Sequence, residues 1–260
     1  MQFERVAEAV ADVPNMTLPQ GRSVYDHLTA TRSRHVLELG TAHGVSACYM
    51  AAAVEERGGR VVTIDQVTAT KSREPQPSDV IDRAGLHDAI ERVLVPDSSY
   101  TWWLKKQVEV HSDASGNVQP QYDFCYIDGA HNWTIDGLSV YLVEKLLRPG
   151  GWLLLDDLEW LYDPSTPFVG PGGQGADDLA LSQEERAVPH MRAVFDLIVK
   201  QHPSFTEFKV QNDDWGWAGK NAGAQRKLAI VEVAPPVATQ AKRLLRKVRH
   251  SERLRKLSHR

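Results

Sequence analysis

The sequence predicts an α/β fold in which a mostly parallel sheet carries helices on both faces. Short apolar runs of strand length alternate with longer helical patterns along most of the 260 residues, which is typical of parallel strands joined by crossover helices. Four of the first five strand runs lead into an acidic residue and the other leads into a glycine. A composition of 42% hydrophobic and 25% charged residues is that of a globular protein and excludes a disordered or collagen-like chain.

The first part of the chain contains three predicted strands and two predicted helices. His35–Leu39 is a short apolar run closed by a glycine, and the Ala-rich segment Val45–Glu56 is helical and ends near two further glycines. Arg60–Ile64, which is rich in β-branched residues, is the second strand. A helix through Asp79–Glu91 leads into the third strand, Arg92–Val95.

The same alternation continues through the second part of the chain. Tyr122–Ile127 is the fourth predicted strand, and the helix Leu138–Leu147 stops at the breaker residues Arg148–Gly151. Trp152–Leu155 is the fifth strand. The last predicted elements are one helix and two strands, which cover Val188–Gln201, Phe205–Val210 and Leu228–Val233.

The turn after the first strand has the character of a ligand-binding loop. Glycines at 40 and 44 let the backbone turn sharply and approach a ligand, and the following helix offers free N–H groups. Asp65, at the end of the next strand, is placed to accept hydrogen bonds from two ribose hydroxyls. The spacing differs from the G-x-G-x-x-G pattern of dinucleotide sites.

A Gly/Pro-rich stretch at residues 162–187 follows the fifth strand. Loops of this length within a folded domain are usually binding loops, lids or disordered segments. Its position just after a strand end predicts a lid over the substrate, and a surface insertion without a role is the alternative.

Four segments, taken together and in this order, resemble the class I S-adenosylmethionine (SAM)-dependent O-methyltransferases. They read E-L-G-T-x-x-G-x-S from Glu38, V-V-T-I-D from Val61, Y-D-F-C-Y-I-D-G-A-H from Tyr122 and L-L-R-P-G-G-W-L-L-L-D-D from Leu146. Within that class the chain is most similar to the metal-dependent branch that includes catechol-type and macrolide-sugar enzymes. The resemblance covers roughly residues 34–160 and implies a Rossmann-like sheet of seven strands with the last strand antiparallel.

The resemblance also implies a cofactor site for SAM. Glu38, Gly40, Thr41 and Gly44 would shape the pocket, Ser46 would begin the helix beside the methionine moiety, Asp65 would hold the ribose, and Asp97 and Ser98 would lie against the adenine.

Asp128, Asp156 and Asp157 follow two strands that are neighbours in this topology. Carboxylates brought together in this way repel one another unless a cation lies between them, and a hard divalent cation such as Mg²⁺ prefers oxygen ligands. The resembled family holds its metal at the matching three positions, although its catechol-type members have Asn in place of Asp157. Capping of the next turn by Asp156 or Asp157 is the alternative.

His131 stands three residues after Asp128, where the resembled family carries its general base. That base is lysine in catechol-type enzymes and histidine in the macrolide-sugar enzymes. A hydroxyl bound to Mg²⁺ becomes more acidic, and a histidine can take its proton near neutral pH. By analogy with the macrolide-sugar enzymes, the resemblance implies a sugar-like hydroxyl as the acceptor. Trp133 and Trp160 flank the expected site, whereas Trp215 and Trp217 are expected to pack or form a hairpin.

The net charge of −4 is unevenly distributed. Residues 241–260 hold nine Lys/Arg and one Glu, so this tail carries +8 and the rest of the chain −12. We therefore expect one methyltransferase domain over residues 1–236 and a basic tail with helical spacing over residues 237–260. The acidic body disfavours DNA as a partner, while the tail would suit an anionic membrane, RNA, or the acidic body of a second copy in a homodimer.

Cys48 and Cys125 form neither a metal-ligand pattern nor a disulfide framework, and the N-terminus lacks an apolar signal segment, so a cytoplasmic enzyme is expected. The main hypothesis is a Mg²⁺-assisted O-methyltransferase that acts on a sugar or glycosylated small molecule, for example a macrolide sugar or a methylated mannose polysaccharide precursor. The alternatives are an RNA methyltransferase, an enzyme similar to the cephalosporin hydroxylases, and a SAM-binding protein without catalytic activity.

Overall fold

The structure, a computed structural model, describes residues 2–71, 73–96, 99–162 and 181–223. Several predictions fall outside these residues: the adenine contacts Asp97 and Ser98, most of the lid, the strand Leu228–Val233 and the basic tail.

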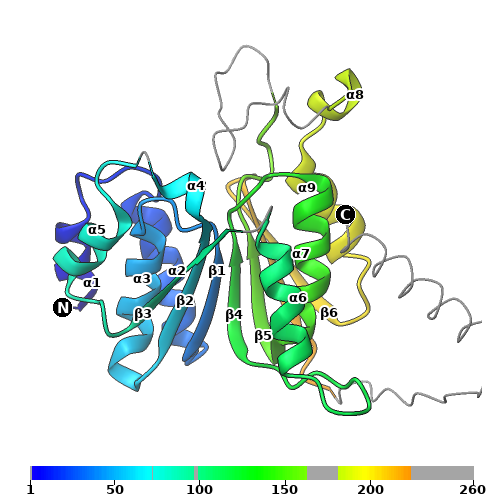
Figure 1. Ribbon diagram of the computed structural model, residues 1–260, viewed down its shortest axis with the longest axis horizontal. Coiled ribbons are helices and arrows are strands. Elements are labelled where there is room, and N and C mark those ends of the chain that lie inside the picture. The colour runs from blue at the N-terminus through cyan, green and yellow to red at the C-terminus, as the bar shows by residue number, and fades with distance from the viewer. Residues whose placement is uncertain (1, 72, 97–98, 163–180, 224–260) are drawn as a thin grey trace, which may run out of the picture. The chain divides into compact units, whose positions relative to one another are not determined.

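Seven strands form one sheet in the order β3-β2-β1-β4-β5-β7-β6 (Figure 1). The strands from β3 to β5 are mutually parallel, and β7 runs antiparallel to both of its neighbours. This arrangement confirms the predicted Rossmann-like sheet, which is mostly parallel and has its last strand antiparallel. The strands are β1 (His35–Leu39), β2 (Arg60–Gln66), β3 (Ile90–Val95), β4 (Tyr122–Ile127), β5 (Leu147–Leu155), β6 (Phe205–Gln211) and β7 (Trp215–Lys220).

Helices cover both faces of the sheet (Figure 1). One face is covered by α1 (Gln2–Ala9), α2 (Leu18–Ala30), α3 (Val45–Val54) and α5 (Pro77–Ala84). The other face is covered by α6 (Tyr100–Val110), α7 (Trp133–Leu146), α9 (His190–Val194) and the π-helical turn η3 (Phe195–Val199). The remaining short helices are η1 (Glu55–Arg57), α4 (Val67–Thr70) and α8 (Gln183–Arg186).

Strand β4 shows how one sheet supports two cores. Phe124 and Tyr126 pack among the side chains beneath α2 and α3, whereas Cys125 and Ile127 pack toward α6 and α7. Successive strand residues point to opposite faces, so a continuous apolar run buries both sides of the strand.

One helix boundary and one strand assignment differ from the sequence-based expectation. Helix α7 begins at Trp133 because Asn132 caps it, with Oδ1 accepting from the backbone N–H groups of Thr134 and Ile135. The last described strand is β7, which forms a hairpin with β6 and carries the buried Trp215 and Trp217, as expected, although the segment was not predicted to be a strand of the sheet. Its glycines hid the strand pattern, yet they are needed because Gly216 lies directly against the ring of Phe195.

Helices α1, α2 and α6 had no counterpart among the predicted elements. Helix α2 starts with a capping box, in which Thr17 and Gln20 satisfy each other's backbone N–H groups.

Among the described residues, none of the helices combines the length and the apolar character needed to cross a membrane.

Candidate active site

The turn between β1 and α3 is fitted closely against the end of β4. Gly40 has φ of +98°, and a Cβ at this position would overlap the carbonyl oxygen of Asp128. Gly44, with φ of +84°, is the N-cap of α3. Only glycine combines this backbone conformation with such a close approach, so the predicted ligand-binding turn and Asp128 lie side by side.

A buried network of polar side chains joins this turn to β1, β2 and α3. Glu38 is fully buried and accepts hydrogen bonds from the hydroxyls of Ser46 and Thr63, the latter at 2.5 Å. Thr41 Oγ1 lies 2.7 Å from Thr63 Oγ1. Burial raises the pKa of Glu38 to about 8, although the two hydroxyl contacts act in the opposite direction. Three of the predicted cofactor residues therefore belong to one network, and Thr63 is a member that the sequence reasoning missed.

Asp65 lies at the end of β2, beside the same turn. Its Oδ2 is 3.3 Å from the backbone nitrogen of Ala42, and its Oδ1 accepts from the backbone N–H of Gln66 at 2.8 Å. Burial raises the pKa of the Asp65 carboxyl. The Asp65 side chain is thus held next to the glycine turn, where a residue that binds the ribose would need to lie.

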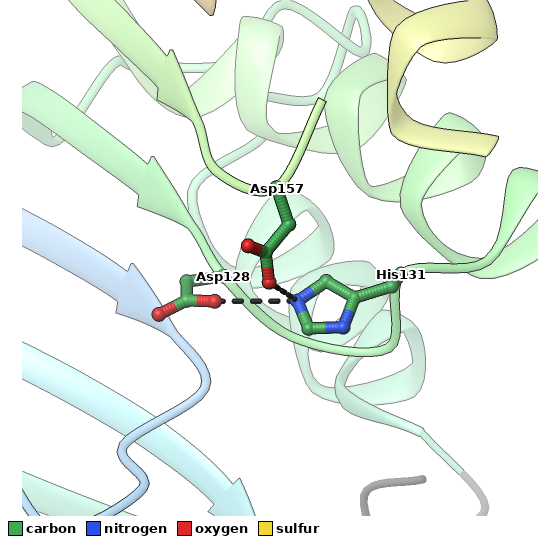
Figure 2. A group of neighbouring side chains, drawn as sticks. All are labelled: Asp128, His131 and Asp157. Carbon is green, nitrogen blue, oxygen red and sulfur yellow. Dashed lines mark hydrogen bonds and ion pairs between the residues drawn. The ribbon is translucent and has the colours of Figure 1, made fainter. Parts of the chain in front are cut away.

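His131 and two of the predicted metal ligands converge where β4 and β5 end (Figure 2). The Nε2 atom of His131 lies 3.3 Å from Asp128 Oδ1 and 3.0 Å from Asp157 Oδ2. His131 and Asp157 both adopt left-handed backbone conformations, with φ of +51° and +55°. Non-glycine residues adopt this region infrequently, and such conformations cluster at functional sites.

The third predicted metal ligand, Asp156, is hydrogen-bonded to other protein groups. One of its oxygens accepts from the hydroxyl of Tyr126, and Oδ1 accepts from the backbone N–H of Asp157 at 2.8 Å. Tyr126 also lies within 3.4 Å of Asp128. The three aspartates therefore lie around the ends of the paired strands β4 and β5 as the sequence predicts, with Asp156 partly occupied by Tyr126.

The electrostatics of the cluster reflect a surplus of carboxylates. Burial, reinforced by the charges of Asp128 and Asp157, raises the pKa of Asp156 well above its ordinary value. Burial alone would lower the pKa of His131, but hydrogen bonds to Asp128 and Asp157, together with their charges, outweigh it and raise that pKa.

The donor set fits a hard divalent cation. Potential ligand atoms lie within 4.8 Å of one another in two groups that share Asp157, one with Asp128 and His131 and the other with Asp156 and Asp214. Oxygen-rich sets of this kind suit Mg²⁺ and similar ions. Asp214 was missed by the sequence reasoning, because it reaches the site from the turn before β7, which pairs with β5 across the sheet.

Aromatic side chains form one wall of the site. The ring centroid of Trp160 is 5.2 Å from that of His131 and 4.4 Å from that of Tyr162. Tyr162 donates to the carbonyl oxygen of Ala130 at 3.0 Å and so ties this wall to the loop that carries His131. Trp215 and Trp217 are buried core residues instead.

Solved structures similar to this chain include several O-methyltransferases. An O-methyltransferase from Bacillus cereus in complex with SAH shares 21% identity and a TM-score of 0.57, covering 85% of this chain and 90% of its own. The O-methyltransferase TomG from Streptomyces achromogenes, involved in tomaymycin synthesis and solved with SAM, shares 19% identity and a TM-score of 0.53, with coverage of 85% and 89%. Cofactor-bound Rv0187 from MTB shares 22% identity and a TM-score of 0.55, with coverage of 85% and 91%. No curated protein matches the chain significantly in sequence.

The chain therefore has the fold of solved O-methyltransferases, which confirms the fold that the resemblance drawn from the motifs implies. A sequence profile for a family described as a methyltransferase domain matches residues 37–158. This segment runs from β1 to just beyond β5 and contains the glycine turn, the aspartates and His131.

Proposed function

We propose that this protein is a SAM-dependent O-methyltransferase that methylates a hydroxyl of a small molecule. The observation that carries the proposal is the position of His131 Nε2 between Asp128 and Asp157, beside a glycine turn of the kind that binds SAM. The likeness to solved O-methyltransferases with SAH or SAM supports the same reaction class.

SAM would occupy the turn between β1 and α3. Gly40 and Gly44 let the backbone approach the cofactor, the network around Glu38 holds the turn in place, and Asp65 would accept hydrogen bonds from the ribose hydroxyls. Asp97 and Ser98 keep their proposed contact with the adenine.

Mg²⁺ or another hard divalent cation would be held by Asp128, Asp156 and Asp157. When bound, such a cation makes an acceptor hydroxyl more acidic. His131 would take the hydroxyl proton at Nε2 while the acceptor oxygen attacks the methyl carbon and the carbon–sulfur bond of SAM breaks, leaving SAH. Asp128 and Asp157 raise the pKa of His131 and so favour its protonated form, which cannot accept a proton. Nε2 can therefore act as the base only when a cation balances the charges of these two aspartates.

We further propose a carbohydrate-bearing acceptor, since the base position holds histidine and the ring of Trp160 lies beside it. The aromatic face offers a surface on which the C–H face of a sugar can stack. A homodimer in the cytoplasm is the assembly and location that we propose for the enzyme.

Replacement of His131 tests the catalytic role. His131→Ala should lower kcat by about 10²–10⁴-fold, the usual contribution of a general base. The Kd for SAM, measured by isothermal titration calorimetry, should stay unchanged because the cofactor turn does not include His131. Exposed His87, which lies far along the sequence in the turn before β3, provides the matched control His87→Ala. Retention of more than a tenth of the wild-type rate in His131→Ala would exclude the role.

A further inference from the structure

Two buried side chains fix the backbone on both sides of His131. The backbone N–H of Ala130 donates to the Tyr100 hydroxyl oxygen at 2.9 Å, and that of Asn132 donates to Asp136 Oδ2 at 2.8 Å. Tyr100 in turn donates its hydroxyl hydrogen to Asp136 Oδ1. The residues before and after His131 are therefore tied to a single hydrogen-bonded pair.

The pair is deeply buried and comes from two different helices. Tyr100 is the first residue of α6 and is 5% exposed, while Asp136 lies in the first turn of α7 and is fully buried. Burying a carboxyl group and a phenol is costly unless each finds hydrogen-bond partners. Here the partners are chiefly the backbone N–H groups of the loop that carries His131, and this points to a role in holding that loop.

Gly129 shows how closely Tyr100 is fitted to the loop. A Cβ at Gly129 would overlap the hydroxyl and ring of Tyr100. Tyr100 therefore lies directly against the backbone between Asp128 and His131, and no larger residue can occupy that position without displacing it.

We propose that Tyr100 and Asp136 are positioning residues, which hold His131 in its left-handed conformation with Nε2 directed at Asp128 and Asp157. The expected effect of this pair on the reaction rate rests on the proposed function, whereas its expected effect on the loop backbone does not. Left-handed conformations are disfavoured for residues with a side chain, so His131 keeps one only where its neighbours impose it. Fixed N–H groups at both flanking residues supply that constraint.

The structural consequence is measured by hydrogen exchange of the backbone amides in the wild-type chain and in two variants. Tyr100→Phe removes the acceptor for Ala130, and Asp136→Ala removes the acceptor for Asn132. Each amide should exchange up to about tenfold faster in its own variant, as expected for one lost hydrogen bond. Tyr122→Phe, at the opposite end of β4, is the matched loss of a buried tyrosine hydroxyl and should leave both amides unchanged. Unchanged exchange at Ala130 and Asn132 in all variants would overturn the proposal.

The kinetic consequence separates positioning from a general structural role. Tyr100→Phe should lower kcat by about 10- to 100-fold, since misplacement of a reacting group by about 1 Å can cost 10²-fold. It should leave the Kd for SAM unchanged, and Asp136→Asn, which keeps an acceptor for Asn132, should restore most of the rate lost in Asp136→Ala. Adding Tyr100→Phe to His131→Ala should cause no further loss, because the pair acts through His131. Full additivity of the two changes would contradict positioning through His131.

The two arms also separate this proposal from the proposed function. If the wild-type chain transfers no methyl group yet the Ala130 and Asn132 amides respond as expected, the positioning pair stands and the reaction is wrong. If methyl transfer is found and the amides do not respond, the reaction stands and the positioning pair is wrong.

Discussion

Replacing Glu38 by glutamine should make the protein more stable at neutral and alkaline pH. Glu38 is fully buried under the glycine turn, and burial raises its pKa from an ordinary 4.5 to about 8. The folded protein therefore keeps the proton on Glu38 at neutral pH, whereas the unfolded chain releases it. Glutamine resembles the neutral acid, because its carbonyl oxygen can accept from one of the two hydroxyls that contact Glu38, those of Ser46 and Thr63, while its NH2 group can donate to the other.

The size of the effect follows from the shift in pKa. Between pH 4.5 and about 8 the folded state binds one more proton at Glu38 than the unfolded state does, so the contribution of Glu38 to stability falls as the pH rises. Each pH unit corresponds to about 1.4 kcal/mol. Relative to Glu38→Gln, the wild type should lose about 3 kcal/mol between pH 4.5 and 7, and about 4 kcal/mol by pH 8.

Urea unfolding of both proteins between pH 4.5 and 8.5 measures this difference. Thermal unfolding should show the same trend, at about 2–4 °C per kcal/mol for a domain of this size. The matched change Glu207→Gln, at an exposed position on β6, controls for the loss of one surface acid. A difference between wild type and Glu38→Gln that stays constant across this pH range would refute the reasoning.

Three further predictions test other parts of the structure. Asp128→Asn and Asp156→Asn should weaken the binding of Mg²⁺ measured by calorimetry, and unchanged activity of both variants in excess chelator would exclude a metal role. Lys220 donates to the carbonyl of Leu147 at 2.8 Å and pairs with buried Glu144 at 3.0 Å. Lys220→Met should therefore lower the free energy of unfolding in urea by about 3–5 kcal/mol, and adding Glu144→Gln should restore part of it. A loss below about 1 kcal/mol would contradict this. Burial lowers the pKa of His27 from 6.5 to about 4, so the wild type should lose stability relative to His27→Leu as the pH falls from 6.5 to 4. Parallel pH profiles of the two proteins would show that His27 is not responsible.

The parallel half of the sheet could be predicted from the sequence because its strands are buried on both faces. Runs such as Tyr122–Ile127 are apolar apart from Asp123 and stop at an acidic residue, which marks both the strand and the position of its end. The same logic brought Asp128, Asp156 and Asp157 together, since neighbouring parallel strands end at one edge of the sheet.

The remaining features depend on contacts between distant segments. Strand β7 was missed because Gly216 and Gly219 have low strand propensity. The reason for these glycines lies in distant contacts, since a Cβ at Gly216 would overlap the ring of Phe195 and one at Gly219 would crowd Glu207 and the ring of Trp152. Asp214 joins the cluster through the antiparallel pairing of β7 with β5, for which no local pattern existed.

The pairing of Tyr100 with Asp136 was equally hidden. The two residues lie on different helices and are 36 positions apart, and neither helix start was predicted. A buried acid in the first turn of a helix, next to a candidate base, is the one sequence signal that could have drawn attention to Asp136.

The most direct test of the central claim is transfer of labelled methyl from SAM into fractionated cell extract, run with Mg²⁺ and with EDTA. We predict label in a small carbohydrate fraction with Mg²⁺ present and its loss in EDTA. Label that persists in EDTA would remove the metal from the mechanism. Label in RNA would show that the acceptor is RNA and not a small molecule. Binding of SAM with no transfer into any fraction would contradict the claim that this chain is an O-methyltransferase.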